Sequence, residues 1–382
     1  MSLLPFSLFI YLYTTGSLFY DTIHYILHQG TNSPWRLLRF LSTCHQYHHF
    51  HYNQSLNFND RYLKRNIFIA LPLELLCQML GSVVGRIIAQ PYLHPTNIPI
   101  LNQCLSLTLL IQITRTLLVM TMSGRDSNHI ITFDTVPKDT NWVFVGPHFH
   151  ALHHIHPDRY MGSMIKLVDW VAGTAYSFRH KRVILTGGTG AFGSALEKQL
   201  LCEGVRGITK LRYGRDWTHG DFTRVGCILR EADILILAHG SKDVDAMAAN
   251  CHSSIQLIET FLEEKEKYKT RGKKPTPMPE IWYIGSEIEL HPAWGIPELQ
   301  RYSASKRAFV PYARGLYQNP KVLYRHIVPA AFQSSMGKAI VSADWAASVT
   351  MWWIHRGAWY VPVTYTGLAV VNYFKFRFGR GC

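Results

Sequence analysis

The sequence predicts an α-helical membrane unit followed by an α/β unit built on a doubly wound parallel sheet. Long apolar runs separated by histidine-rich segments fill the first 122 residues, and from Lys181 short strand-like runs alternate with helical patterns. A chain of 382 residues is long enough for two domains of roughly 150 residues or more. We place the membrane domain at residues 1–178 and the α/β domain at residues 179–382.

The composition favours a membrane surface as the partner of this chain. Charged residues make up 17% of the sequence and hydrophobic residues 47%, with a net charge of +14. Soluble domains carry roughly 25% charged residues. No run of Lys and Arg with interleaved aromatic residues suggests nucleic acid binding, so we expect contact with anionic lipid instead. Seven scattered cysteines form no disulfide framework and favour the reducing cytosol.

Three apolar runs, at residues 1–20, 67–89 and 98–122, are long enough to cross the roughly 30 Å core of a bilayer. The first run carries no charge and is expected to be an uncleaved anchor. Residues 21–66 contain several Arg and Lys, whereas residues 90–97 contain none. The positive-inside rule therefore places residues 21–66 and everything after residue 123 in the cytosol. We expect an integral membrane protein of the endoplasmic reticulum with both catalytic domains facing the cytosol.

Histidines are concentrated in the first half of the chain, where 14 of the 20 lie at or before residue 180. They form three clusters with helical spacing, so that the rings of each cluster lie on one helix face. All three clusters fall on the cytosolic side of the predicted topology. Their members are His24 and His28; His45, His48 and His49; and His150, His153 and His154.

Neutral imidazole is a common ligand of iron, zinc and copper. Eight histidines are too many for one ion, and two irons with open positions for O2 are a natural count. The alternative is that these histidines are interfacial or buried in the core without a metal. Four further histidines are weaker candidates, with outer-sphere or surface roles equally expected: His51, His129, His148 and His156.

The order HxxxH, HxxHH, HxxHH around membrane spans resembles the fatty acid hydroxylase/sterol desaturase superfamily of membrane di-iron oxygenases. The likeness covers residues 15–176 and includes Asp169 and Gly173-Thr174, where that family carries D-x-x-x-G-T. It implies two Fe ions, O2, a lipid-like substrate and an electron donor such as a cytochrome b5-type or ferredoxin protein. Members usually have one more span, so four transmembrane helices are the alternative to three.

A glycine-rich turn, TGGTGAFG, follows the strand-like run RVILT and opens a helical stretch. Glycine allows the tight turn and lets backbone N–H groups approach a pyrophosphate at the helix N-terminus. The order of strand, turn and helix is the context that a dinucleotide-binding site requires. We therefore expect a nucleotide to bind at Thr186, Gly187, Gly190 and Gly193.

Tyr302 and Lys306 form a YxxxK pair whose side chains share one helix face. A neighbouring ammonium lowers the pKa of a phenol from about 10 towards neutrality, which makes Tyr302 a candidate general acid and base. Ser286 follows the apolar run IWYIG and could hydrogen-bond a carbonyl oxygen at the same place.

Residues 181–345 resemble the short-chain dehydrogenase/reductase family through this pair, Ser286 and the glycine turn. The resemblance implies that Ser286 orients the substrate, Tyr302 transfers the proton and Lys306 binds the nicotinamide ribose. It also matches Asn250 with the family's asparagine that holds a proton-relay water. The sequence departs from the family at residues 237–240, LAHG in place of N-N-A-G, and at Pro329-Ala330.

The run GITKLRYGR, which ends the second strand-like segment, contains no acidic residue to bind a ribose 2′-hydroxyl. Arg212 and Arg215 would instead suit a 2′-phosphate, so we expect NADP(H), with NAD as the alternative. A merely solvated basic loop is the other interpretation. Further strand-like runs are expected at residues 207–213, 233–238 and 281–285.

Together these patterns predict a bifunctional membrane oxidoreductase. The first domain would hydroxylate or desaturate a lipid-like substrate (a sterol, a fatty acyl chain, or a polyketide or terpenoid intermediate), and the second would interconvert the alcohol and carbonyl with NADP(H). One alternative is an aldehyde-processing enzyme similar to plant wax-alkane proteins, and another is a catalytically inactive membrane scaffold. The apolar, basic C-terminal run from Trp359 is expected either to dock on the bilayer or to pack against the α/β core.

Overall fold

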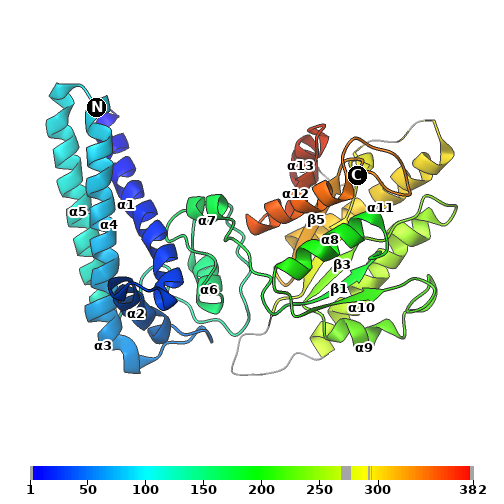
Figure 1. Cartoon of the computed structure of the whole chain (residues 1–382), viewed down its shortest axis with the longest axis horizontal. Coiled ribbons are helices and arrows are strands. Elements are labelled where there is room, and N and C mark those ends of the chain that lie inside the picture. Colours follow the sequence, from blue (N-terminus) through cyan, green and yellow to red (C-terminus); the bar gives the residue numbers. More distant parts are fainter. Residues whose placement is uncertain (1–2, 268–276, 291–292, 294, 379–382) are drawn as a thin grey trace. The chain divides into compact units, whose positions relative to one another are not determined.

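The computed structural model describes residues 3–267, 277–290, 293 and 295–378. The described chain divides into two compact units, one ending at Ala175 and one beginning at Tyr176. The first unit is helical, and the second contains the sheet (Figure 1). The predicted order of a helical part followed by an α/β part is confirmed.

Three long helices form the body of the first unit, namely α1 (Leu4–Gln29), α4 (Leu71–Ala89) and α5 (Ile98–Thr121). α1 packs against both of the others. Small residues let α1 and α4 approach closely, because a Cβ at Gly81 would lie 2.4 Å from Phe19 and one at Gly85 would lie 2.3 Å from Thr15. The shorter helices are α2 (Arg36–His51), α3 (Leu63–Arg65), α6 (Pro147–Ile155) and α7 (Leu167–Ala172), and a π-helical turn over Asn66–Ala70 joins α3 to α4.

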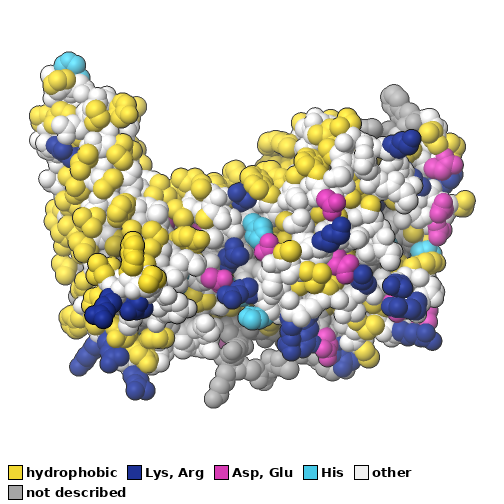
Figure 2. Space-filling model, viewed as in Figure 1, with side chains coloured by type: hydrophobic (Ala, Val, Ile, Leu, Met, Phe, Trp, Pro, Cys, Tyr) yellow, Lys and Arg dark blue, Asp and Glu magenta, His cyan; other side chains and the backbone are white. Residues whose placement is uncertain are grey.

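Two helical segments of the described chain, Asp60–Tyr92 and Pro95–Thr121, are long and apolar enough to cross a membrane by length and composition. They contain the predicted runs 67–89 and 98–122. The predicted run 1–20 lies within α1, which does not meet the same criterion, so a third or fourth span is not confirmed. Figure 2 shows that hydrophobic side chains cover much of the surface of these helices.

The second unit contains one parallel sheet with the strand order β2-β1-β3-β4-β5-β6. The chain runs outward from β1 to β2 and then crosses back to β3 on the other side of β1. The strand order thus reverses between β1 and β3, which is where doubly wound folds bind ligands. The strands are β1 (Arg182–Thr186), β2 (Gly207–Leu211), β3 (Ile234–Leu237), β4 (Glu280–Ile284), β5 (Leu323–Pro329) and β6 (Tyr360–Val363).

Helices cover both faces of this sheet and close two apolar layers, so the predicted doubly wound architecture is confirmed. One layer lies beneath α8 (Ala191–Cys202) and α12 (Ala343–His355). The other lies beneath α9 (Val225–Arg230), α10 (Ser253–Lys267), α11 (Pro297–Gln318) and α13 (Leu368–Phe378). The C-terminal run expected to dock or pack is therefore the last strand and helix of the fold.

A buried carboxylate joins two neighbouring strands at their amino ends. Glu280 on β4 accepts hydrogen bonds from Arg325 Nε of β5 and from Trp282 Nε1, both at 2.8 Å, and from Lys181 Nζ at 2.9 Å. Burial opposes its ionisation, but Lys181 and Arg325 outweigh burial and lower the pKa of Glu280 to about 2. A paired charge at this depth is costly to break.

We predict that Glu280→Gln destabilises the second unit by about 3–5 kcal/mol, because Arg325 would be left buried without its charge partner. The pKa of Glu280 lies below its ordinary value, so its contribution is present above pH 4.5 and is lost as pH falls towards 2. Hydrogen exchange at β4 and β5 in the full chain measures the effect. The exposed pair Arg182–Glu231 supplies the control, since Glu231→Gln should cost at most about 1 kcal/mol. Equal effects of the two substitutions would contradict the prediction.

Candidate functional site

Three helices bring all eight predicted histidines into two groups. α1 contributes two histidines four residues apart, and α2 and α6 each contribute three at the spacing i, i+3, i+4, which turns their rings to one side of each helix. Within each group the ligand nitrogens all lie within 4.8 Å of one another. The first group is His24, His28, His45, His49 and His153, and the second is His48, His129, His150 and His154.

The Nε2 atoms of the first group face one another. His28 Nε2 lies 3.1 Å from that of His24, 3.0 Å from that of His45 and 3.2 Å from that of His49. His153 Nε2 lies 3.2 Å from that of His49, so α6 closes the group. At such separations the lone pairs of several ring nitrogens point into the same small space.

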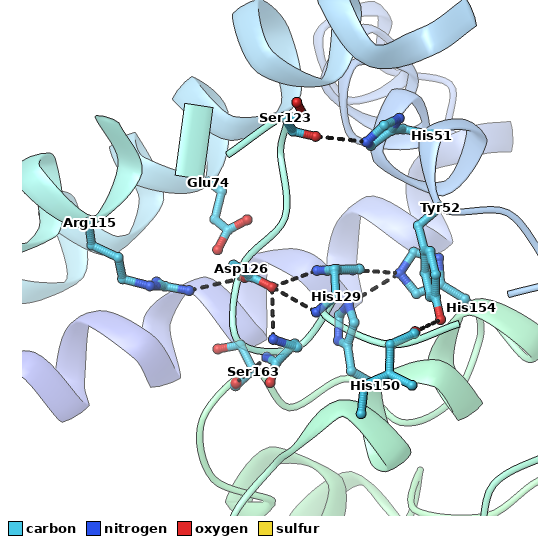
Figure 3. Close-up of polar contacts among 12 residues, drawn as sticks. His51, Tyr52, Glu74, Arg115, Ser123, Asp126, His129, His150, His154 and Ser163 are labelled. Carbon is cyan, nitrogen blue, oxygen red and sulfur yellow. Dashed lines mark hydrogen bonds and ion pairs between the residues drawn. The ribbon is translucent and has the colours of Figure 1, made fainter. Parts of the chain in front are cut away.

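The second group includes His129, which sequence reasoning ranked among the weaker candidates. His129 Nε2 lies 3.1 Å from His154 Nε2, and His150 Nε2 lies 3.2 Å from the same atom. Figure 3 shows His129 held by Asp126, whose Oδ1 lies 2.7 Å from His129 Nδ1. Arg115 on α5 pairs with the other carboxylate oxygen at 3.2 Å. His129 lies in a loop outside any histidine motif, so no spacing pattern indicates that it is a ligand.

Backbone carbonyls fix the tautomers of the two most buried rings of the first group. His24 Nδ1 lies 3.0 Å from the carbonyl oxygen of Met161, and His153 Nδ1 lies 2.8 Å from that of Arg159. A carbonyl accepts only, so each Nδ1 carries the proton and each Nε2 keeps a free lone pair when the ring is neutral. The carboxylate of Asp126 does the same for His129.

Burial lowers the pKa of the histidines on α2 and α6, so these rings are neutral at neutral pH. The residues concerned are His45, His48, His49, His150, His153 and His154. Neutral imidazoles whose lone pairs converge repel one another unless a cation lies between them. The donor set, the orientation and the tautomers therefore fit two metal ions, one for each group.

Asp169 explains why the loop after α6 presents its carbonyl to His24. Its two carboxylate oxygens accept hydrogen bonds from the backbone N–H of Met161 at 2.7 Å and of Gly162 at 2.8 Å, and Thr174 Oγ1 donates to it at 2.5 Å. The D-x-x-x-G-T motif thus fixes the backbone of Met161 and Gly162, and the carbonyl of Met161 orients the ring of His24.

The remaining weak candidates lie outside both groups. Both ring nitrogens of His51 face backbone carbonyls, those of Asn59 and Ser123, each at 3.3 Å. Figure 3 shows the contact with Ser123. His148 is exposed and packs against Phe133, and His156 packs against Tyr160.

In the second unit, the glycine-rich turn lies at the carboxyl end of β1, beside the reversal of strand order. Gly187 has φ +66°, and a Cβ there would lie 2.5 Å from the backbone of Ala238 after β3. A Cβ at Gly193 would lie 2.3 Å from the carbonyl oxygen of Gly187, so only glycine lets α8 begin this close to the strand. Gly190 is the N-cap of α8 and offers no side-chain cap. The helix N-terminus therefore fits a pyrophosphate.

The side chain of Thr186 does not point towards the proposed pyrophosphate site. Its side chain is fully buried, donates to the carbonyl of Ile236 at 3.2 Å and lies 2.6 Å from His239 Nδ1. It therefore ties β1 to β3 beneath the turn.

The two arginines after β2 differ in their surroundings. The guanidinium of Arg215 forms two hydrogen bonds with Asp216, at 2.8 and 2.7 Å, whereas Arg212 contacts Asp216 only through its backbone N–H and carbonyl. Asp216 lies one residue beyond the run in which no acidic residue was found. Arg212 is exposed, so its guanidinium is the better placed of the two to meet an anion.

Ser286, Tyr302 and Lys306 meet at the carboxyl end of β4. The side chain of Ser286 hydrogen-bonds the phenol of Tyr302. Lys306 Nζ donates to the carbonyl of Ile284, the last residue of β4, at 2.8 Å and lies 5.8 Å from the centre of the Tyr302 ring. The predicted group is therefore assembled by the fold.

The expected lowering of the Tyr302 pKa is wrong for the chain by itself. Burial and the nearby charge of Glu289 raise the pKa of Tyr302 to about 12, and the hydrogen bond from Ser286 opposes them only in part. Burial also lowers the pKa of Lys306 to about 8. The ammonium of Lys306 is directed to a backbone carbonyl, so it does little to the phenol.

Asn250 is a positioning residue in this structure. It lies in a π-helical turn, Ala248–His252, and its amide donates to Ser241 O at 2.7 Å and Ser305 Oγ at 2.8 Å. Its side-chain oxygen accepts from Ser241 N at 2.9 Å. These bonds fix the segment after β3 against the helix of Tyr302. The water-holding role implied by the resemblance stays a prediction.

Sequence reasoning missed Glu289, which lies behind the Ser286 and Tyr302 pair. One carboxylate oxygen lies 2.7 Å from His326 Nε2 on β5, and the other accepts from the backbone N–H of Ser286 at 3.4 Å. Tyr324 extends the chain, since its hydroxyl lies 2.8 Å from His326 Nδ1. No spacing rule links residues 289 and 326, so only the sheet register could reveal the contact.

The fold and these residues define a Rossmann-like domain with the residue set of short-chain dehydrogenases/reductases, preceded by a helical unit whose histidine groups could hold metal ions. No family model matches the chain. The chain is 26% identical over 258 residues to the monoglucosyldiacylglycerol epimerase of Synechocystis sp., covering 59% of this chain and 61% of that protein. It thus spans about three-fifths of that relative's length.

Solved structures similar to the chain include a short chain dehydrogenase from Burkholderia cenocepacia in complex with NADP, with 14% identity and a TM-score of 0.43 over 52% of this chain and 94% of that one. Another is a short-chain dehydrogenase from Sphingobium yanoikuyae in complex with NADPH, with 14% identity and a TM-score of 0.40 over 51% and 92%. A third, from Burkholderia phymatum, is in complex with NAD, with 14% identity and a TM-score of 0.42 over 54% and 99%.

We predict that Asp126→Asn weakens metal binding at the second histidine group by about 10–100-fold, because an amide supports the tautomer of His129 less well than a carboxylate. The first group should keep its affinity, since it has no contact with Asp126 within the described residues. Metal content of the purified full chain after dialysis against graded chelator measures both sites. The exposed His148 provides the control, and His148→Gln should change neither. Equal loss at both groups would contradict the prediction.

Proposed function

We propose that this chain is a membrane-bound oxidoreductase whose second unit interconverts a hydroxyl and a carbonyl on a lipid-like substrate with a nicotinamide nucleotide. The observation that carries this proposal is the meeting of Ser286, Tyr302 and Lys306 at the same edge of the sheet as the glycine-rich turn. A proton donor and a pyrophosphate cradle at one sheet edge are what hydride transfer to or from a nicotinamide requires.

We propose NADP(H) as the nucleotide, with NAD as the alternative. When bound, it supplies or accepts the hydride. The open turn at Gly187 and the N-terminus of α8 would hold its pyrophosphate, and Arg212 is available for a 2′-phosphate. Because the guanidinium of Arg215 is paired with Asp216, Arg212 is the arginine that we propose to bind a 2′-phosphate.

The residues divide the proton chemistry as follows. With a pKa of about 12, the phenol of Tyr302 is protonated at neutral pH and can donate its proton to a carbonyl oxygen during reduction. In the reverse direction it must lose this proton first and then accept that of the substrate hydroxyl. Ser286 lies within hydrogen-bond reach of the same phenol and would orient the substrate oxygen. Lys306, fixed by Ile284, would meet the ribose.

The name of the curated relative narrows the substrate class. Inversion of a carbon that bears a hydroxyl requires its C–H bond to break. Because that hydrogen is not acidic, it leaves as a hydride while the hydroxyl loses its proton, and the carbon becomes a carbonyl carbon. Removal of a hydride and a proton, followed by their return to the opposite face, inverts the centre without net oxidation. We therefore propose a hydroxyl of a lipid, with the sugar of a glycosyl lipid as one member of that class.

A second activity is favoured by the nine converging histidines. We propose that the two groups hold two iron ions, which when bound would activate O2 for hydroxylation or desaturation of a lipid-like chain. The histidine rings would hold the ions through their ring nitrogens, and Asp126 and Asp169 keep the rings in place. Electrons would come from a cytochrome b5-type or ferredoxin partner. A wax-type aldehyde-processing reaction and a metal-holding scaffold without activity are the competing outcomes.

We propose that the chain resides in the endoplasmic reticulum membrane through its apolar helices, with the histidine groups of the first unit and the whole second unit facing the cytosol. The support is the length and composition of the two candidate spans, together with the arginines and lysines of residues 21–66.

Lipid profiling in a microsomal host that expresses the full chain tests both activities. We expect Tyr302→Phe to accumulate an alcohol or ketone that the unaltered chain converts further, whereas His153→Ala should lose the oxygenated product altogether. Arg307→Gln, at an exposed position on the same helix as Tyr302, is the control and should leave the profile unchanged. A shortened hydrocarbon would favour the aldehyde-processing reaction. Identical profiles for all variants and the empty host would contradict the proposal.

We predict that Glu289→Gln shifts the pH dependence of alcohol oxidation towards lower pH. The charge of Glu289 raises the pKa of both Tyr302 and Lys306, so its removal lowers both values. Oxidation needs the deprotonated phenol, which then forms at lower pH. The pH profile of kcat/KM with a lipid alcohol measures the shift. A uniform loss of activity with an unchanged profile would indicate a purely structural role for Glu289.

A further inference from the structure

The last helix of the second unit, α13, presents an apolar face to the outside. Val371, Phe374 and Phe378 are 68%, 60% and 73% exposed. Residues spaced by three and four along a helix lie on one face, so these three side chains form a continuous stripe. Figure 2 shows hydrophobic side chains gathered at the edge of the second unit where Figure 1 draws α13.

The opposite face of α13 is firmly packed, so the exposed stripe is held in place. Ala369 and Phe376 are buried in the layer beneath α11, and the Phe376 ring stacks on His326 at 4.7 Å. Tyr360 OH on β6 donates to the carbonyl of Ala369 at 3.0 Å. Turning the helix to hide Phe374 would expose Phe376, so the outer stripe cannot be covered by a rotation of α13.

Two cations flank this apolar stripe. Lys375 and Arg377 are both exposed, and on the helical wheel they fall on either side of Val371, Phe374 and Phe378. α13 contains no acidic residue. Long basic side chains beside an apolar stripe are the pattern of a helix that lies in a membrane interface, where the stems cover acyl chains and the charges reach the headgroups.

We propose that the outer face of α13 docks on the surface of an anionic bilayer. A second copy of the chain is a poorer occupant, because a symmetric contact through this face would bring four like charges together. Anionic lipid instead complements Lys375 and Arg377, and the net charge of +14 adds to the attraction. This proposal rests on the proposed function in one respect, because the membrane placement of the first unit would keep a bilayer close to α13.

Docking through α13 would bear directly on the catalytic helix. α13 packs against α11, which carries Tyr302 and Lys306, and Arg314 of α11 donates to the carbonyl of Lys375 at 2.7 Å. The helix on the bilayer surface is therefore in direct contact with the helix that carries the proposed proton donor. This connection would hold the active unit at the surface from which a lipid substrate must come.

Site-specific fluorescence on the full chain in nanodiscs tests the proposal. An environment-sensitive dye is attached at Val371→Cys on α13, at Gln256→Cys on an exposed position of α10, and at Ile87→Cys, 58% exposed on α4. Discs of phosphatidylcholine with or without phosphatidylglycerol carry a spin-labelled lipid as quencher. The background removes the exposed thiols through Cys202→Ser and Cys227→Ser, and it also carries Cys382→Ser.

We expect quenching at positions 371 and 87 but not at 256, with the quenching at 371 increased by phosphatidylglycerol. Adding Lys375→Gln and Arg377→Gln should shift the docked–undocked equilibrium at 371 by about thirtyfold towards undocked, at roughly fivefold per cation, and leave 87 unchanged. Quenching at 87 without quenching at 371 would overturn the docking while the membrane placement stands. Absence of quenching at both would overturn both proposals. A dye at 371 that is shielded only as more chains occupy each disc would show self-association and overturn the lipid proposal.

Discussion

The convergence of nine imidazole rings is the constraint on which the first unit depends. The ligand nitrogens within each group, five in one and four in the other, lie within 4.8 Å of one another, and burial keeps the rings of α2 and α6 neutral. Lone pairs gathered so closely in a dry interior repel unless a cation compensates them. Binding of a metal to such a site contributes to folding itself, because the unfolded chain has no comparable site. The packing of α1, α2 and α6 therefore forms a site whose geometry suits metal ions.

The groups that hydrogen-bond the second nitrogen of each ring show how residues other than the ligands shape this candidate metal site. Met161 and Arg159 offer carbonyls to two rings, and Asp126 offers a carboxylate to a third. Asp169 in turn fixes the loop that carries Met161. Each support restricts the rotation of a ring before any ion arrives, which is why the loss of an outer-sphere partner typically costs about 10–100-fold in metal affinity.

Much of the fold and of both sites follows from patterns of spacing. Strand-like runs predicted β2, β3 and β4, and the histidine repeats predicted which helix faces would meet. What spacing could not predict are contacts between single residues far apart in the chain. His129 stands alone in a loop, and Glu289 meets His326 only through the sheet. The pKa of Tyr302 is raised first by burial and then by the charge of Glu289, and neither is visible in the spacing. The pairing of Asp216 with Arg215 was also not predicted, although the two are neighbours in the sequence, because it depends on the directions of their side chains.

X-ray absorption spectroscopy of the purified full chain tests the central claim most directly, because it reports the metal and its ligand atoms without requiring a substrate. The account predicts about two ions for each chain, one for each histidine group, with imidazole nitrogen as the dominant ligand. A chain that folds normally with no bound metal, or an ion held mainly by cysteine sulfur, would contradict it.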